Sequence, residues 1–197
     1  MAIQDFNGKT FVAFADIAGF KSMMKDKQRG PESLDALYSS GYRAIKDQEL
    51  DTPHVEGLFV SDCGVLFVRD GCDELAKLES LLTVIEQLNK FCFERAVLLT
   101  TSVAWGDFSY RQRIEIQGIE KAPVCGDAYV EAFRDNESDE SKLYPTECRV
   151  VKDHLPPKVA EMLGSRVGRI GSRSREAEKH YYFEWMRPCN LAGDSSK

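Results

Sequence analysis

The sequence lacks the features that mark membrane and secreted proteins. Its longest apolar runs, such as residues 96–99, are far shorter than the roughly 20 residues that a helix needs to span a bilayer. Residues 1–9 are polar and include Asp5, so no signal peptide is visible. None of the six cysteines forms a CxxC pair, which excludes zinc-ribbon and thioredoxin-like proteins. We therefore expect a cytoplasmic protein with reduced thiols and no membrane partner.

Positive charge is also in deficit. Lys and Arg together number 26 against 32 Asp and Glu, which gives a formal net charge of −6 at pH 7. Binding to a nucleic-acid polymer requires clustered cations, so we expect no such partner. If this chain handles a phosphate group, a small local site has to do so, with a metal ion to offset the acidity.

The chain contains no internal repeat and no long linker rich in Pro, Gly or Ser. What it does contain is ordinary for a globular protein, since 43% of its residues are apolar and 29% are charged. A length of 197 residues suits one domain. We predict that residues 1–190 form a single domain and that residues 191–197, rich in Gly and Ser, form a flexible tail.

The hydrophobic pattern predicts an α+β protein. Its first elements follow the order β-α-α-β-β-α-β, which is typical of a ferredoxin-like split β-α-β core, an antiparallel sheet with helices on one face. Helices are predicted over residues 18–27, 31–50, 73–95, 124–136 and 157–163. Strands are predicted over residues 9–17, 54–60, 64–69, 97–104, 111–116, 147–152, 166–170 and 179–186, with a hairpin at residues 61–64.

Two aspartates stand at the ends of predicted strands. Asp16 closes the first strand, and Asp62 lies at the tip of the hairpin. Each has a simple explanation on its own, as a helix N-cap and as a turn residue. In this strand order, however, both reach the same edge of the sheet, where two carboxylates repel unless a proton or a cation lies between them. Carboxylate oxygens suit Mg²⁺ or Mn²⁺, and the helix start around Gly19 offers N–H groups to an anion.

Four segments together resemble the catalytic domain of class III nucleotidyl cyclases. Residues 14–20, FADIAGF, resemble the family's first metal motif, and residues 59–62, FVSD, resemble its second metal-binding hairpin. Residues 101–106, TSVAWG, are similar to the strand and glycine between them. Residues 126–134, GDAYVEAFR, are similar to the dimer-interface helix that begins with Gly and carries a catalytic Arg eight residues later. The match runs in the family's order over roughly residues 9–134.

The resemblance implies a set of roles at a site shared by two chains. Two divalent ions, Mn²⁺ or Mg²⁺, would be held by one chain, and the catalytic Arg134 would come from its partner in a homodimer. The implied metal ligands are Asp16, the carbonyl of Ile17, and Asp62. The N–H groups implied for the β- and γ-phosphates belong to Ala18, Gly19 and Phe20.

The departures from the family pattern concern the base. Adenylate and guanylate cyclases usually carry Lys or Glu where this chain has Leu58, and Asp or a Cys-type residue where it has Pro123. Their common Asn, four residues before the Arg, is Val130. With both metal aspartates kept and the purine readers missing, the chain resembles the pyrimidine cyclases of Pycsar antiphage defence, which make cyclic UMP or cyclic CMP. This implies UTP as the substrate, with CTP as the alternative, and Leu58 and Pro123 as base-pocket candidates.

Other interpretations stay open at this point. The chain is alternatively a catalytically silent cyclase-homology module that binds a nucleotide, an adenylate or guanylate cyclase with unusual base recognition, or a relative of GGDEF or polymerase-palm domains. Arg173 and Arg175 are phosphate candidates in a basic segment that is equally well explained as a solvated loop. The three histidines, His54, His154 and His180, show no ligand spacing and are assigned no role.

Overall fold

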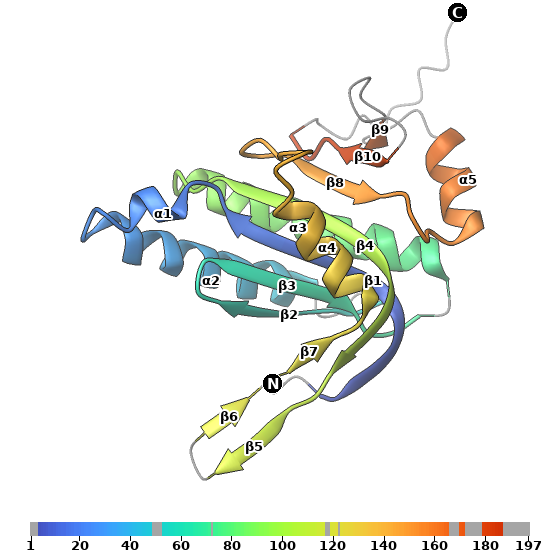
Figure 1. Cartoon of the computed structure of the whole chain (residues 1–197), viewed down its shortest axis with the longest axis horizontal. Coiled ribbons are helices and arrows are strands. Elements are labelled where there is room, and N and C mark those ends of the chain that lie inside the picture. Colours follow the sequence, from blue (N-terminus) through green and yellow to red (C-terminus); the bar gives the residue numbers. More distant parts are fainter. Residues whose placement is uncertain are drawn as a thin grey trace, which may run out of the picture.

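A single large sheet organises the protein. The computed structural model describes residues 4–48, 53–71, 73–116, 119–121, 123–165, 170–171 and 179–186. Within these residues an eight-stranded sheet has the order β2-β3-β1-β4-β8-β10-β9, and β7 pairs with β4 beside this path (Figure 1). The strands are β1 (Phe6–Ile17), β2 (Val55–Val60), β3 (Cys63–Val68), β4 (Leu99–Tyr110), β5 (Arg113–Ile116), β6 (Ile119–Lys121), β7 (Val124–Cys125), β8 (Cys148–Val151), β9 (Ile170–Gly171) and β10 (His180–Phe183). The helices are α1 (Phe20–Met23), α2 (Arg29–Asp47), α3 (Glu74–Glu94), α4 (Asp127–Asn136) and α5 (Pro157–Ser165).

The predicted split β-α-β core is confirmed. Strand β1 lies between β3 and β4 and is antiparallel to both, while β2 and β3 form the predicted hairpin. The one parallel pair among the described strands joins β4 to β8. The sheet is therefore predominantly antiparallel, as the sequence pattern predicts.

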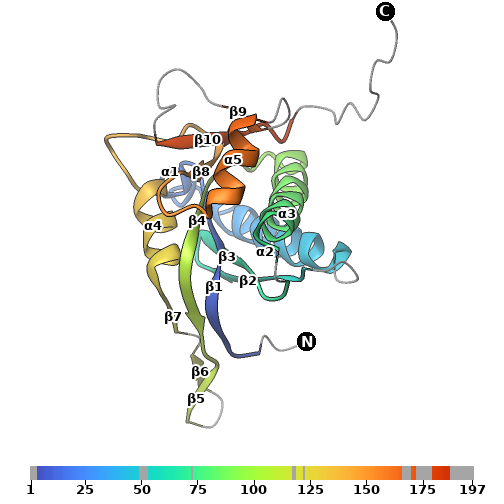
Figure 2. The same cartoon turned by 90° about the vertical axis from the view of Figure 1, so that its right-hand side faces the viewer.

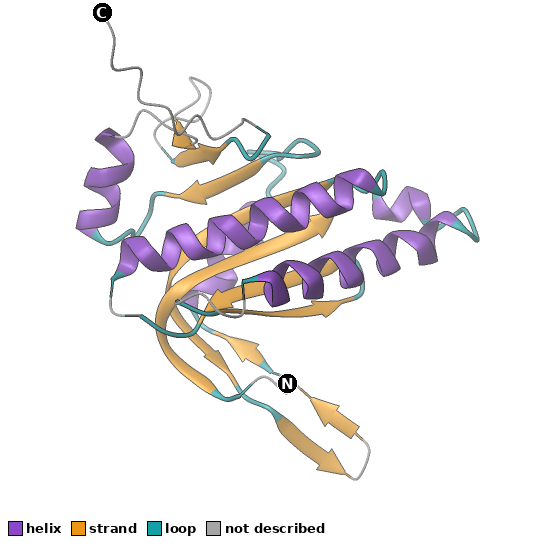
Figure 3. Cartoon of the chain, turned by 180° about the vertical axis from the view of Figure 1, so that it is seen from behind, coloured by secondary structure: helices purple, strands orange, loops and turns teal. Residues whose placement is uncertain are grey.

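Helices cover both faces of this sheet. Figure 2 shows α4 on one side of the central strands and α2 with α3 on the other. In Figure 3, which shows the molecule from behind, the α2–α3 layer faces the viewer. Alternate residues of β1 enter two separate cores: Phe11 and Ala13 pack under α2 and α3, and Val12 and Phe14 pack under α4. Because side chains alternate across a strand, a strand covered on both faces appears as a continuous apolar run. The prediction of helices on one face holds for α2 and α3, and α4 adds a layer on the opposite face.

Several element boundaries differ from the prediction. The helix predicted over residues 18–27 is reduced to the four residues of α1, because Asp26 Oδ1 accepts the N–H groups of Gln28 and Arg29 and ends the segment in a turn before α2. Strand β4 is longer than predicted, since it pairs with β1 over its whole length, from Leu99 to Tyr110. Residues 124–125 form a strand rather than the start of a helix.

Three further predictions concern the strand over residues 111–116, the absence of a membrane span, and the C-terminal tail. The hairpin β5–β6 extends away from the body of the sheet (Figure 1). Of the helices in the described part of the chain, none combines the length and hydrophobicity needed to cross a membrane. The predicted tail, residues 191–197, lies outside the described residues.

Candidate active site

The fold brings Asp16 and Asp62 together at one end of the sheet. Asp16 pairs in register with Cys63, the residue that follows Asp62, and the N–H of Ile17 donates to the carbonyl of Asp62 at 3.0 Å. Ser61 makes the tight hairpin possible by adopting a positive φ of 54°, and its hydroxyl donates to Asp62 Oδ1 at 2.9 Å. The β1 end and the hairpin tip are thus fixed against each other by backbone pairing.

The electrostatics of this corner show how close the acidic groups lie. Burial first, and then the charges of Asp62 and Glu137, together raise the pKa of Asp16 from 3.8 to about 7. The pKa of the Cys63 thiol rises to about 11, first through burial and then through the same three carboxylates. Glu137, the residue that ends α4, is therefore a third acidic neighbour that the sequence pattern does not reveal. Its approach depends on how α4 crosses the sheet.

These residues fit a divalent cation. Neither Asp16 nor Asp62 forms an ion pair with any described residue, so their mutual repulsion has no internal counter-charge. Among the described residues no three or more His, Cys, Asp or Glu side chains converge on a common point. The site therefore offers two carboxylates and the adjacent Ile17 carbonyl, with water and substrate oxygens left to complete the coordination, as is usual for Mg²⁺.

Replacing Asp16 by Asn should stabilise the metal-free protein. Because the pKa of Asp16 is raised in the folded state to about 7, its stabilising proton is lost as the pH rises through 7, and the buried charge then opposes folding. We expect Asp16→Asn to raise the Tm in EDTA at pH 8 by a few degrees, since 1 kcal/mol shifts Tm by about 2–4 °C at this length. The gain should shrink at pH 5. Mn²⁺ should stabilise the wild type but not the variant, and equal Mn²⁺ stabilisation of both would contradict the ligand assignment.

The three N–H groups predicted to hold phosphates are not equivalent. The Ala18 N–H donates to the Leu98 carbonyl at 2.9 Å, so in this structure it is already occupied, contrary to its predicted role. Gly19 adopts a positive φ of 76°, which glycine tolerates without strain, and precedes Phe20 at the start of α1. The first N–H groups of a helix have no intrahelical partner. Gly19 and Phe20 therefore remain the candidates at this turn.

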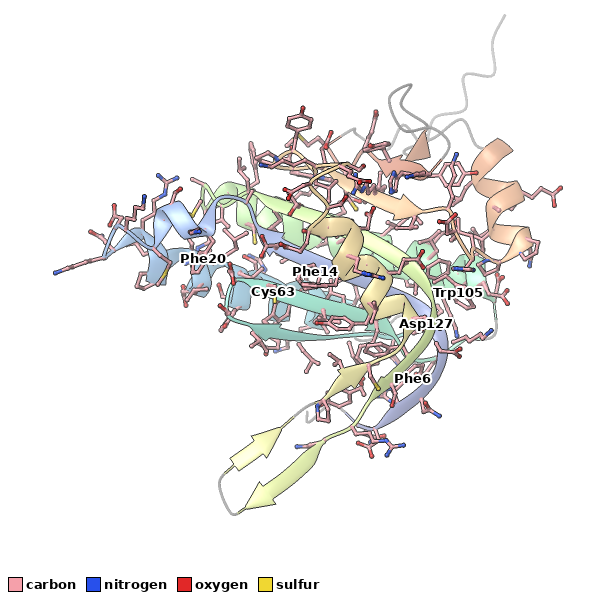
Figure 4. The ribbon with its side chains drawn as sticks, in the orientation of Figure 1. Phe6, Phe14, Phe20, Cys63, Trp105 and Asp127 are labelled. Carbon is pink, nitrogen blue, oxygen red and sulfur yellow. The ribbon has the colours of Figure 1, made fainter. Side chains whose placement is uncertain are left out.

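Arg134 lines a cavity that does not include the two aspartates of its own chain. It is exposed on α4 and lines a cavity of about 1300 Å³, which neither Asp16 nor Asp62 lines. Figure 4 shows Phe20 and Cys63 toward one end of the sheet, and Trp105 and Asp127, which line the cavity, toward the other. Within the described part of the chain Arg134 makes no ion pair. In a single chain, therefore, the arginine lines a cavity and the Asp pair does not.

The start of α4 explains why glycine stands before this helix. Gly126 has a φ of 122°, and a Cβ there would lie 2.2 Å from the carbonyl oxygen of Asp107 and 2.7 Å from the Cα of Phe108. Only glycine permits the helix to begin so close to β4. The predicted start at Gly126 therefore reflects a backbone contact, and this contact sets the height of α4 above the sheet.

The base-pocket candidates lie on β2 and just before β7. Leu58 is half-buried in β2 and packs against the core beneath α4, and Pro123 is exposed just before β7. Neither carries a side chain that can hydrogen-bond a base. Val130, at the position of the family's Asn, is exposed on α4 and also lines the cavity. Arg173 and Arg175 lie outside the described residues.

A buried ionic cluster beside Arg134 was not predicted. Asp135 accepts from Arg149 Nε at 2.7 Å and is also hydrogen-bonded to His180 Nε2 at 2.8 Å and to the Ser102 hydroxyl. Burial alone would raise the pKa of Asp135, but the bonds to His180, Arg149 and Ser102 outweigh it and lower the pKa. The one available signal in the sequence was a cation inside the apolar strand CRVV, because a buried Arg requires an acidic partner.

Comparisons with known proteins identify the fold as that of nucleotidyl cyclase catalytic domains. The sequence matches no protein-family model and no curated protein. The structure matches the guanylate cyclase domain of RhGC from Catenaria anguillulae, with a TM-score of 0.63 and 11% identity, covering 92% of this chain and 98% of that one. It also matches a bacterial light-regulated adenylyl cyclase, with a TM-score of 0.61, 12% identity and 95% of this chain covered, and it spans 55% of that longer chain. The guanylyl cyclase Cya2 gives a TM-score of 0.53 at 14% identity, covering 92% and 93% of the two chains.

Proposed function

We propose that this protein is a nucleotide cyclase that converts UTP to 3′,5′-cyclic UMP and pyrophosphate. The observation that carries the proposal is that Asp16 and Asp62 lie side by side at the sheet edge of a cyclase fold, where Ile17 N–H donates to the Asp62 carbonyl at 3.0 Å. A turn residue or an N-cap has no need of a second half-buried acid beside it. A nucleoside triphosphate that arrives with divalent ions does need such a pair.

The reaction joins two parts of one substrate. The ribose 3′-oxygen attacks the α-phosphorus, a 3′-O–P bond forms, the bond from the α-phosphorus to the bridging oxygen breaks, and pyrophosphate leaves while the 3′-OH proton passes to solvent. Bound Mn²⁺ or Mg²⁺ ions would supply Lewis-acid chemistry at this site. Asp16, the Ile17 carbonyl and Asp62 would hold these ions, with the two carboxylates supplying the negative charge. Arg134 stabilises the negative charge that develops on the α-phosphate.

The preference for a pyrimidine base rests on what Leu58 and Pro123 cannot do. The guanylate cyclase domain from Catenaria anguillulae was solved with GTP, and a rhodopsin-guanylyl cyclase of converted specificity was solved with ATPαS. Reading a purine edge requires buried hydrogen-bonding groups, and sites that lack them discriminate poorly. We infer that a smaller base is read by other groups of the dimer, and we favour UTP over CTP.

The proposed enzyme is a homodimer with two equivalent sites. Arg134 lines a cavity that the Asp pair of its own chain does not line. A head-to-tail arrangement of two chains would bring each Arg134 to the partner's aspartates. Solved neighbours include a dimeric and a monomeric form of the guanylyl cyclase domain from Blastocladiella emersonii. A monomer of this protein should be inactive, because each of its half-sites is incomplete.

A product assay tests the activity. The purified chain is incubated with each of the four NTPs and Mn²⁺, and the products are separated by chromatography. Cyclic UMP supports the proposal, and cyclic CMP alone would move the assignment to a cytidylate cyclase. Cyclic AMP or cyclic GMP alone would overturn the pyrimidine assignment. Absence of any product, with nucleotide binding retained, would indicate a catalytically silent module.

The resemblance to Pycsar cyclases extends the proposal to a biological role. In that role cyclic UMP is a signal in bacterial antiphage defence, and the enzyme acts in the cytoplasm. The matching measurement is the cyclic UMP content of cells before and after phage infection. A cyclic UMP content that stays constant through infection would argue against the defence role, but it would not argue against the proposed cyclase reaction.

A further inference from the structure

The last turn of α4 is held by a buried ion pair that lies directly beside Arg134 in the chain. Arg149, on β8, is 1% exposed, and Asp135, on α4, is 12% exposed. The guanidinium donates to both carboxylate oxygens, from Nε to Oδ2 at 2.7 Å and from Nη2 to Oδ1 at 2.9 Å. His180 from β10 and Ser102 from β4 complete the shell around the carboxylate. Three strands therefore converge on one helical residue.

The same arginine also binds the backbone of the helix. Arg149 Nη2 donates to the main-chain carbonyl of Asp135 at 2.7 Å, and its Nη1 donates to the Ser141 hydroxyl at 2.9 Å. The last carbonyls of a helix lack intrahelical partners, and a cation there also complements the helix dipole. Arg149 thus caps α4 and ties it to the segment that follows.

Asn136, the residue after Asp135, attaches the end of α4 to two further strands, β1 and β4. Asn136 Nδ2 donates to the Phe14 carbonyl of β1 at 3.3 Å, and its Oδ1 accepts from Thr100 Oγ1 of β4 at 3.2 Å. At its other end α4 rests on β4 through the close approach of Gly126. The helix is therefore fixed in rotation and in height, and Arg134, immediately before the clamped pair, is left exposed at the cavity.

Stability alone does not account for the ion pair. Replacing a buried ion pair by well-packed apolar residues is often neutral or stabilising, because removing two charges from water costs about as much as their attraction returns. What the pair adds is geometry, since a two-pronged Arg–carboxylate contact fixes both distance and angle. The element that it fixes carries the arginine of the proposed site.

We propose that Arg149, through its clamp on Asp135, is a positioning residue that aims Arg134 at the α-phosphate of the nucleotide in the partner's half of the site. This inference rests on the proposed cyclase function. Arg149 does not touch the substrate and acts only through the orientation of α4. Its contribution should therefore vanish when Arg134 is absent.

A double-mutant cycle with Arg134 tests this dependence. We expect Arg149→Met to lower kcat by roughly 10- to 100-fold with little change in KM, because small misplacements of a catalytic group have effects of this size. In the Arg134→Ala background the same change should lower kcat by less than about twofold. Arg149→Lys, which keeps the charge but loses the two-pronged contact, should fall between Arg149→Met and the wild type.

The matched control is a second arginine that forms a partly buried ion pair remote from α4. Arg69 contacts Glu56 at 2.5 Å and binds the carbonyls of Gln4 and Asp5. Arg69→Met and Arg149→Met should both lower the Tm, because each leaves a carboxylate without its partner, yet Arg69→Met should leave kcat within about twofold of wild type. Equal losses of kcat from Arg149→Met with and without Arg134 would overturn the proposal, and so would an unchanged kcat.

Hydrogen exchange separates this inference from the proposed function. Exchange of the amides of residues 133–137 should accelerate in Arg149→Met and not in Arg69→Met. If the wild type makes no cyclic nucleotide from any NTP, the cyclase proposal fails. Hydrogen exchange at residues 133–137 then still tests whether Arg149 holds the end of α4 in place. Unchanged exchange at these residues in Arg149→Met would overturn the clamp whatever the activity.

Discussion

Replacing Asp62 by Ala is expected to lower the cyclase turnover at least about 1000-fold, because losing the metal site removes several kcal/mol of charge stabilisation and each 1.4 kcal/mol is a factor of ten. The fold should survive, since among the described residues the Asp62 side chain accepts only from the neighbouring Ser61 hydroxyl, while the backbone carbonyl that binds Ile17 N–H remains in the variant. Initial rates of cyclic UMP formation and thermal unfolding of the same preparations measure both effects.

Asp70 provides the matched control for this substitution. It is exposed in the loop that follows β3, at the opposite end of this strand from Asp62. The same change of charge there should leave turnover within about twofold of wild type. Turnover of Asp62→Ala within tenfold of wild type, with Mn²⁺ binding intact, would remove Asp62 from the metal site.

Mixing two severely impaired variants is expected to restore activity. Asp62→Ala and Arg134→Ala chains should each retain only a small residual activity as homodimers, because each damages one half of every site. In the mixed dimer one of the two sites combines an intact Asp pair with an intact Arg134. With random exchange half of the dimers are mixed, so activity should return to about a quarter of wild type.

The control for complementation combines defects in the same half-site. A mixture of Asp62→Ala and Asp16→Ala chains contains no intact Asp pair, so it should stay inactive. Recovery in this control, or failure of the first mixture to recover although mass spectrometry shows mixed dimers, would argue against a site shared between chains. The two mixtures differ only in where the second substitution lies.

The fold was largely predictable because its central strands carry strong local patterns. The hairpin at residues 61–64 and the long helix that begins after Asp73 follow from turn chemistry and from helical spacing, and both are present. The short α1 was not predictable in its length. The Asp26 side chain accepts the N–H groups of Gln28 and Arg29, which would otherwise bond to helix carbonyls. The hydrophobic pattern contains no information about this side-chain hydrogen bonding.

The candidate site, like the fold, has features that the sequence predicted and features that it did not. Asp16 and Asp62 could be placed together because strand order and a tight hairpin are local enough to be inferred. Glu137 could not, since its approach to Asp16 depends on the angle at which α4 crosses the sheet. Ala18 was predicted to offer an N–H group, but the Leu98 carbonyl, at the start of β4, occupies it.

The amino-acid sequence by itself determined the split β-α-β core, the two aspartates at one sheet edge, and the glycine that starts the helix bearing Arg134. These features depend on periodicity, turn chemistry and strand order, which neighbouring residues encode. Only the tertiary structure decided that Arg134 faces a cavity away from its own aspartates and that Asp135 is clamped by Arg149 and His180. Those contacts join residues 14 and 45 positions apart, and their partners are set by sheet register and helix docking.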